Sequence, residues 1–324
     1  MLTSEKIIKY IVDNGQASGK QLSDIINEIT PRAIRKQLKS LLDKGILKKI
    51  GRPPKVYYLL QTKNEIPIFE PIDKTIKQII DKRYLYISPS GESMFGWEGF
   101  LFWCEKTKQD PAKTAKEYTA TVKKFDKYKK NGFIDGMLKI KNTFKEVFLD
   151  KIFYLDFYSI ERFGKTKLGQ MLLYAKQSQN RGLMRKLIED IRLKIIFFIK
   201  KYKIDGILFI PPTVKREVQF MRELEKELRL PVRTVSVSKL RTGIIVPQKT
   251  LSKLEDRIEN AKNTIVIDEK KQYKNILLID DAVGSGATLN ETARKIRSKK
   301  LATGEIIGLA IAGSFKGFDI ISEI

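Results

Sequence analysis

Histidine is absent from this chain, and cysteine occurs only once, as Cys104. These absences exclude internal disulfides, zinc or iron–sulfur sites built from several cysteines and histidines, and catalysis by an imidazole. Long apolar segments are lacking too, since the longest run, residues 195–199, has five residues, whereas a membrane-spanning helix needs about 20. The N-terminus has no apolar segment typical of a signal peptide. We therefore expect a soluble, cytoplasmic protein that does not bind membranes.

Acidic residues are few relative to basic ones. The chain has 63 lysines and arginines against 38 aspartates and glutamates, which gives a formal charge of +25. Such an excess attracts polyanions, whether nucleic acid, an anionic membrane surface or a phosphorylated small molecule. Lysine outnumbers arginine by 47 to 16, a bias that an AT-rich genome also produces without selection for binding. The positions of the charges therefore have to decide between these partners.

The first 62 residues have the pattern of a small DNA-binding domain. A length of 324 residues predicts two or three domains, because a domain usually has about 100 to 200 residues. Apolar spacing predicts three helices and then two strands, at residues 4–14, 19–28, 31–44, 46–50 and 56–60. Three helices followed by a hairpin is the order of a winged helix, in which the third helix enters the major groove of DNA. The residues expected to bind double-stranded DNA are Arg32, Arg35, Lys36, Lys39, Arg52 and Lys55.

The rest of the chain divides into residues 63–150 and 151–324. The first part is predicted to be a mainly helical connecting region, whose role the sequence does not indicate. In the second part, strands expected at 206–210, 232–237, 275–279 and 306–312 alternate with helical segments at 167–201, 214–228 and 289–300, and a long loop is expected at 238–263. Such alternation predicts an α/β domain with a parallel sheet flanked by helices.

The most informative segment runs from Ile276 to Leu289. A continuous apolar strand leads to Asp280 and Asp281, at the carboxyl end, where open α/β sheets bind their ligands. Glycines and hydroxyl residues follow directly and enter a helix, so that backbone N–H groups can hold a phosphate. Acceptors for sugar hydroxyls and donors for a phosphate thus lie side by side. No lysine follows the glycine, as a P-loop would require.

This segment resembles the phosphoribosyl-diphosphate (PRPP) signature of type I phosphoribosyltransferases. Pro211-Pro212 after a strand, then Lys215-Arg216, is similar to the ComF-like group of that family, and the resemblance covers residues 151–324. The downstream residues that match the order and spacing of that group are Arg241, Gln248, Leu251, Arg257 and Asn260. Two departures are the lack of the usual four-cysteine zinc module and Gly284-Ser285, where two hydroxyl residues are commoner.

The resemblance implies roles for individual residues. Asp280 and Asp281 would be catalytic and would hold the ribose hydroxyls. Magnesium would bind together with PRPP, mostly through pyrophosphate and ribose oxygens, and no residue is assigned as a metal ligand of its own. The residues expected to bind the 5′-phosphate of PRPP are Ala282, Val283, Gly284, Ser285, Gly286, Ala287 and Thr288. The residues expected to bind pyrophosphate are Lys215, Arg216, Arg241 and Arg257.

Two functions from different classes follow. In the first, the protein binds DNA and senses PRPP in order to regulate transcription or DNA processing, an architecture that resembles the purine operon repressor. In the second, it is an active phosphoribosyltransferase that transfers phosphoribosyl from PRPP to a nucleobase-like acceptor and releases pyrophosphate. Only 12 residues follow the strand that ends at Ala312, so an acceptor pocket would have to come from residues 61–170. A role as an accessory of nucleic-acid uptake or defence rests on the ComF likeness alone. The sequence leaves open whether the chain forms a homodimer.

Overall fold

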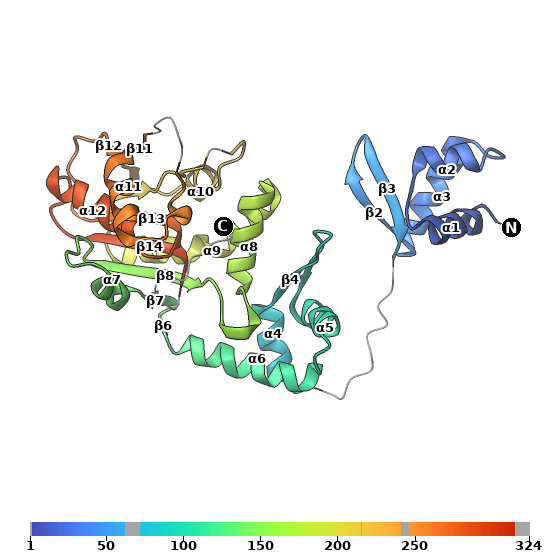
Figure 1. The fold of residues 1–324 in the computed structure, drawn as a ribbon, viewed down its shortest axis with the longest axis horizontal. Coiled ribbons are helices and arrows are strands. Elements are labelled where there is room, and N and C mark those ends of the chain that lie inside the picture. Colours follow the sequence, from blue (N-terminus) through green and yellow to red (C-terminus); the bar gives the residue numbers. More distant parts are fainter. Residues whose placement is uncertain (1, 62–71, 215, 241–245, 315–324) are drawn as a thin grey trace. The chain divides into compact units, whose positions relative to one another are not determined.

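The computed structural model describes residues 2–61, 72–214, 216–240 and 246–314 (Figure 1). Contacts divide the chain into two compact units, residues 1–68 and 69–324. The domain boundary predicted between 62 and 63 lies outside the described residues. The boundary predicted between 150 and 151 falls inside the second unit.

The first unit combines three helices with a small antiparallel sheet. Its elements follow the predicted order, with one additional strand, β1, and the sheet has the order β1-β3-β2. The elements are α1 (Thr3–Asn14), β1 (Ala17–Ser18), α2 (Gly19–Ile25), α3 (Pro31–Asp43), β2 (Leu47–Arg52) and β3 (Lys55–Leu60).

Local sequence signals explain where these helices begin. The Ser18 side chain accepts a hydrogen bond from the Gln21 backbone, and the Gln21 side chain bonds back to the Ser18 backbone, which forms a capping box. Thr30 caps α3 just before Pro31, a residue suited to the first helical position. Apolar residues at helical spacing then pack the three helices on the sheet in a core of their own: Ile7, Ile11, Leu22, Ile34, Leu38, Leu41 and Leu47.

The second unit is built around a seven-stranded sheet in the order β10-β9-β13-β14-β8-β7-β6. The five strands from β10 to β8 are parallel, and β7 and β6 continue the sheet in antiparallel fashion. The strands of this sheet are β6 (Lys129–Lys130), β7 (Phe133–Asp135), β8 (Lys151–Phe157), β9 (Gly206–Phe209), β10 (Arg233–Thr234), β13 (Ile276–Val283) and β14 (Ile306–Gly313).

Helices and two small hairpins surround this sheet. The helices are α4 (Lys74–Arg83), α5 (Gly96–Lys106), α6 (Pro111–Asp126), α7 (Met137–Thr143), α8 (Lys167–Ser178), α9 (Arg181–Lys201), α10 (Phe220–Leu228), α11 (Leu254–Thr264) and α12 (Ala287–Ser298). The remaining strands pair as β4 (Leu85–Ile87) with β5 (Ser93–Phe95) and as β11 (Val237–Lys239) with β12 (Ile265–Ile267).

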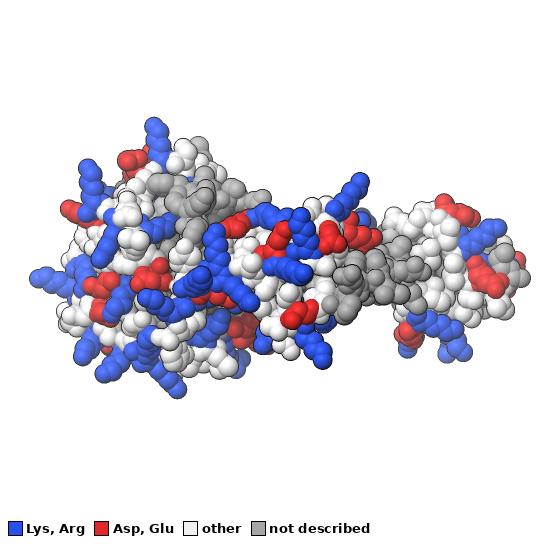
Figure 2. Space-filling model, turned by 90° about the horizontal axis from the view of Figure 1, so that it is seen from below, with Lys and Arg blue, Asp and Glu red and all other residues white. Residues whose placement is uncertain are grey.

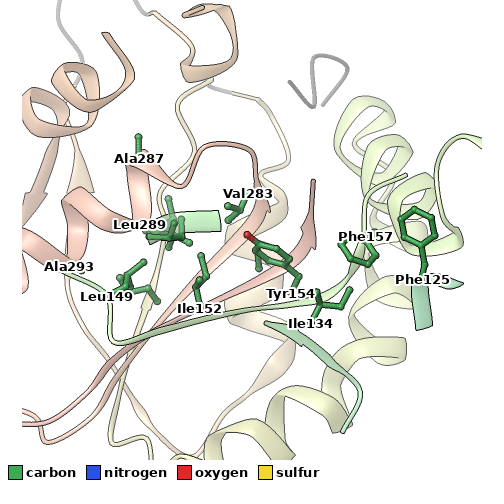
Figure 3. Packing of buried hydrophobic residues seen from close by; sticks show 14 of the residues in the cluster. Phe125, Ile134, Leu149, Ile152, Tyr154, Phe157, Val283, Ala287, Leu289 and Ala293 are labelled. Carbon is green, nitrogen blue, oxygen red and sulfur yellow. The ribbon is translucent and has the colours of Figure 1, made fainter. Parts of the chain in front are cut away.

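Both faces of the sheet are buried, which is why β9, β14 and the first half of β13 are apolar. In β13, Leu277 and Ile279 pack with α8, α9 and α10, while Ile276 and Leu278 pack with α12 on the other face. Figure 3 shows the α12 side, where Ile152 and Tyr154 from β8 point toward Leu289 and Val283. The sheet is therefore fixed from both sides, and its loops at the carboxyl ends project from a rigid core.

Several predicted elements differ from the structure. The strand expected at 275–279 continues through both aspartates to Val283, because Ala282 and Val283 still pair with β14. The loop expected at 238–263 contains α11, a largely polar helix in which only Arg257 and Ala261 are buried, so its apolar pattern is weak. Strands β6, β7 and β8 were not predicted; β6 and β7 have only two and three residues, too few for a periodic pattern.

No described helix is both long enough and apolar enough to span a bilayer.

Candidate functional site

The site lies at the carboxyl ends of the neighbouring strands β9 and β13, where the chain leaves the two strands in opposite directions. From β9 the chain passes through α10 to β10 on one side, and from β13 it passes through α12 to β14 on the other. In open α/β sheets the crevice at such a switch point is where ligands bind. A cavity of about 220 Å³ opens here. Its lining includes Pro211–Thr213, which follow β9, and residues 280–289, which form the end of β13 and the loop behind it.

Asp280 and Asp281 occupy the last part of β13, next to β14. The Asp281 backbone N–H donates to Asp280 Oδ1 at 2.8 Å. Lys176 on α8 forms an ion pair with Asp281, with 2.6 Å between Nζ and Oδ2, and each side chain is 18% exposed. The pKa of Asp280 is raised because burial disfavours its charge and Asp281 adds a second negative charge, an effect that Lys176 and Lys239 only partly oppose. The two carboxylates therefore differ in their surroundings: Asp281 forms an ion pair with Lys176, whereas burial and the neighbouring charge raise the pKa of Asp280.

The glycine loop that follows is shaped by its backbone. Gly286 is the N-cap of α12 and has a φ of 88°, a left-handed conformation that favours glycine. A Cβ atom at this position would also come within 2.3 Å of Ile140 Cδ1. The buried Ser285 hydroxyl accepts a hydrogen bond from the Ala287 N–H at 3.3 Å. The loop thus leads directly into the positive end of a 12-residue helix.

Two of the four cations predicted to bind pyrophosphate line the cavity. Arg257 comes from α11, is 5% exposed, and donates from Nε to the Leu251 carbonyl at 2.7 Å. Burial lowers the pKa of its guanidinium. Arg216 donates to the Lys176 carbonyl. Lys215 and Arg241, the other two, lie outside the described residues.

Two further lysines at the cavity were missed in the sequence. Lys176 is one of several lysines on an amphipathic helix, and Lys239 lies in β11, inside the segment predicted to be a loop. Lys239 donates from Nζ to Thr213 Oγ1 at 2.6 Å, and burial lowers its pKa to about 8 against the opposing effect of Asp280. Nothing in the local sequence separates these two from the other 45 lysines, because only the tertiary structure brings them to the aspartates.

The balance of charge in the cavity favours an anionic ligand with hydroxyl groups. Four cations, Lys176, Arg216, Lys239 and Arg257, surround two carboxylates. The cations and the α12 N-terminus can bind phosphates, and the carboxylates can accept hydrogen bonds from hydroxyls. On the face that Figure 2 shows, Lys and Arg are spread over the surface with acidic residues between them.

The predicted DNA-binding residues all lie in the first unit and are all exposed. On α3 they occupy the side opposite the buried Ile34, Leu38 and Leu41. In the hairpin, Arg52 pairs with Lys55 at the end of β2 and β3. The basic residues exposed on α3 are Arg32, Arg35, Lys36 and Lys39.

Comparisons with known proteins do not show a family for this chain. No protein-family model matches the chain, and no curated protein matches it. Among solved structures, a hypoxanthine phosphoribosyltransferase from Staphylococcus aureus is a weak neighbour, with 14% identity and a TM-score of 0.24 over 40% of this chain and 72% of that one. The second unit itself has a mixed α/β architecture, with a seven-stranded and mostly parallel sheet flanked by helices.

Proposed function

We propose that the second unit binds PRPP at the β9/β13 cavity and that the first unit is a winged helix that binds double-stranded DNA. The protein then senses PRPP and regulates transcription or DNA processing. The observation that carries this proposal is the cavity itself, where adjacent carboxylates, a glycine loop before a helix and four cations meet at the switch point of the sheet. PRPP presents ribose hydroxyls, a 5′-phosphate and a pyrophosphate, one group for each of these features.

Each group of the cavity has a defined task in this proposal. Asp281, which is paired with Lys176, accepts hydrogen bonds from ribose hydroxyls together with Asp280. The loop 282–288 binds the 5′-phosphate through backbone N–H groups, and Arg216, Arg257 and Lys239 bind pyrophosphate. Lys215 and Arg241, outside the described residues, are proposed for the same group.

Magnesium fits this arrangement only together with the ligand. The described residues contain no group of three or more acidic or cysteine side chains that could hold a metal ion. Carboxylate oxygens of Asp280 and Asp281 are ligands of the kind Mg²⁺ prefers, and phosphate and ribose oxygens would complete its coordination. The ion would neutralise pyrophosphate charge.

The position of the Asp280–Asp281 pair in the cavity also favours a second candidate, transfer of phosphoribosyl to a nucleobase-like acceptor. A carboxylate next to the ribose stabilises positive charge that develops on the sugar as pyrophosphate leaves. A turnover assay with PRPP and a panel of bases tests this candidate. Release of pyrophosphate that depends on the base would establish the enzyme, and its absence would leave the sensor.

The sensor is tested by measuring DNA affinity with and without saturating Mg–PRPP. A ligand shifts a conformational equilibrium only if it binds one state better, and such couplings typically change affinity by about 5- to 150-fold. We expect a change in this range, and by linkage the same factor for PRPP binding when DNA is present. Superimposable titration curves would reject the sensor.

Asp281→Asn is expected to weaken PRPP binding by roughly tenfold or more, since it removes a charge-assisted acceptor for ribose hydroxyls. Asp280→Asn should weaken it less, because this carboxylate already has a raised pKa. Calorimetry with Mg–PRPP measures both. The control is Asp268→Asn, at an exposed position. Affinities equal to wild type in both variants would contradict the assignment of the ribose site.

PRPP affinity is expected to fall as pH rises from about 7 to about 9, because Lys239, with a pKa of about 8, loses its positive charge in this range. In Lys239→Met, affinity at pH 7 should be lower and this pH dependence should flatten. Binding measured at a series of pH values decides the point. A wild-type slope that persists in Lys239→Met would assign the titration to another group.

A further inference from the structure

The corner between α8 and α9 lies outside the lining of the β9/β13 cavity but contacts a loop that lines it. Helix α8 ends at Ser178, and Gln179 follows as its C-cap. Gln179 is not among the residues that line the cavity, and the proposed function gives it no role. Its side chain nevertheless forms a hydrogen bond with the loop that carries Arg216, one of the cations proposed to bind pyrophosphate.

This loop, between β9 and α10, is held in place by side chains. Strand β9 ends at Phe209 and α10 begins at Phe220, and no described residue between them belongs to a helix or strand. The backbone groups of such a segment need partners other than those of regular secondary structure. Gln219 supplies two of them, since its Nε2 donates to the carbonyls of Val214 and Arg216 at 3.1 and 3.2 Å. The shape of the loop therefore depends on individual side chains.

Two further contacts of the loop come from the end of α8. Gln179 Oε1 accepts a hydrogen bond from the Val218 backbone N–H at 2.9 Å. The Arg216 guanidinium donates to the Lys176 carbonyl. The end of α8 thus holds both the backbone of the loop and the side chain that the loop presents. The Lys176 side chain pairs with Asp281 at 2.6 Å, so the same end of α8 contacts residues that follow β9 and residues at the end of β13.

The backbone at Gln179 is left-handed, with a φ of 53°. After the end of a helix this conformation favours glycine, and asparagine next. Glutamine is a poorer choice for such a backbone, but its side chain is long enough to reach Val218, 39 residues further along the chain. What glutamine adds at this corner is therefore its side-chain amide.

We propose that Gln179 is a positioning residue of the anion site, which fixes the backbone at Val218 and thereby orients Arg216 toward the pyrophosphate of PRPP. A guanidinium has five N–H donors, so the bond to the Lys176 carbonyl leaves donors for a ligand in the cavity that Arg216 lines. A loop that is ordered before the ligand arrives loses less conformational freedom on binding, which raises affinity. This role rests on the proposed function, because it concerns the pyrophosphate part of the same site.

The test compares two parts of the ligand by calorimetry on the full-length protein: inorganic pyrophosphate and ribose 5-phosphate, each with Mg²⁺. Gln179→Asn keeps an uncharged amide and suits the left-handed backbone, but its side chain is shorter by one methylene. We expect it to weaken pyrophosphate binding by roughly fivefold, the effect of one lost hydrogen bond, and to leave ribose 5-phosphate binding unchanged. Gln170→Asn, the same substitution at another partly exposed position of α8 outside the cavity, should change neither affinity.

Two further variants separate positioning from folding. Gln179→Gly relieves the left-handed backbone and removes the amide. Its melting temperature should therefore stay close to that of wild type, while its pyrophosphate affinity falls as in Gln179→Asn. Arg216→Met removes the cation itself. If Gln179 acts through Arg216, combining Gln179→Asn with Arg216→Met should cause no further loss than Arg216→Met alone.

The outcomes distinguish the role of Gln179 from the proposed function. The positioning role alone is wrong if wild type and both Gln179 variants bind pyrophosphate equally, if the two ligands lose affinity to the same extent, or if the losses in the double variant add. If the wild type binds no pyrophosphate, the proposed pyrophosphate ligands are wrong as well.

Discussion

DNA binding by the full-length protein is expected to weaken by about a thousandfold when the salt concentration rises from about 50 to about 200 mM. The reason is that each phosphate neutralised releases condensed counterions and contributes about −0.9 to the slope of log affinity against log salt. Six exposed basic residues on α3 and at the end of the β2/β3 hairpin therefore give a slope of about −5 if all contact phosphates. Fluorescence anisotropy with a labelled duplex, over a series of salt concentrations, measures it.

Single substitutions show which side chains contribute to this slope. Arg35→Ala and Arg52→Ala should each reduce affinity and make the slope less steep by about one unit. Lys9→Ala, exposed on α1, is the control and should leave the slope unchanged. If no duplex binds at about 50 mM salt, a condition that favours phosphate contacts, the proposed DNA role of this unit is wrong.

Gly286→Ala is expected to lower the free energy of unfolding by about 2 to 4 kcal/mol, the sum of a left-handed backbone cost and overpacking. An alanine at this position would have to keep the φ of 88°. Its methyl group would also lie 2.3 Å from Ile140 Cδ1. Moving the loop to relieve both would displace the N-terminus of α12, so PRPP binding should be lost as well. Urea unfolding and calorimetry measure the two effects.

Gly284→Ala, two residues earlier in the same loop, is the matched control. A Cβ atom there meets only Arg257 Nη1, at 3.7 Å, an ordinary van der Waals contact. Its stability should stay within about 0.5 kcal/mol of wild type. Equal destabilisation by the two substitutions would show that the loop responds to any added methyl group and not to the backbone conformation at Gly286.

Two local signals in the sequence predicted the order of elements in residues 1–60 and the strand end that carries the two aspartates. The order of elements in residues 1–60 followed from apolar spacing, a proline after Thr30 and glycine breaks, because these signals act within a few residues of one another. The position of Asp280 and Asp281 at the ligand-binding end of the sheet followed from a single apolar strand and the glycine loop behind it. Whether these segments bind DNA and PRPP stays a prediction.

Only the tertiary structure decided which other segments belong to the sheet and which other side chains line the cavity. Strand β7 pairs with β8, and β6 pairs with β7. No pattern in their short sequences predicts this pairing. Arg257 reaches the cavity because α11 folds where a loop was predicted. Lys176 and Lys239 reach the aspartates from elements about 105 and 41 residues away in the chain.

The physical reason is the range of the interactions. Caps, turns and amphipathic periods depend on neighbours in the chain, so the sequence by itself determined the helices of the first unit, the alternation of the second and the motif that follows β13. Ion pairs, shifted pKa values and cavities depend on distances between segments that are remote in the chain. The tertiary structure alone therefore decided the ion pair between Lys176 and Asp281, the raised pKa of Asp280 and the cavity that brings four cations to the two aspartates.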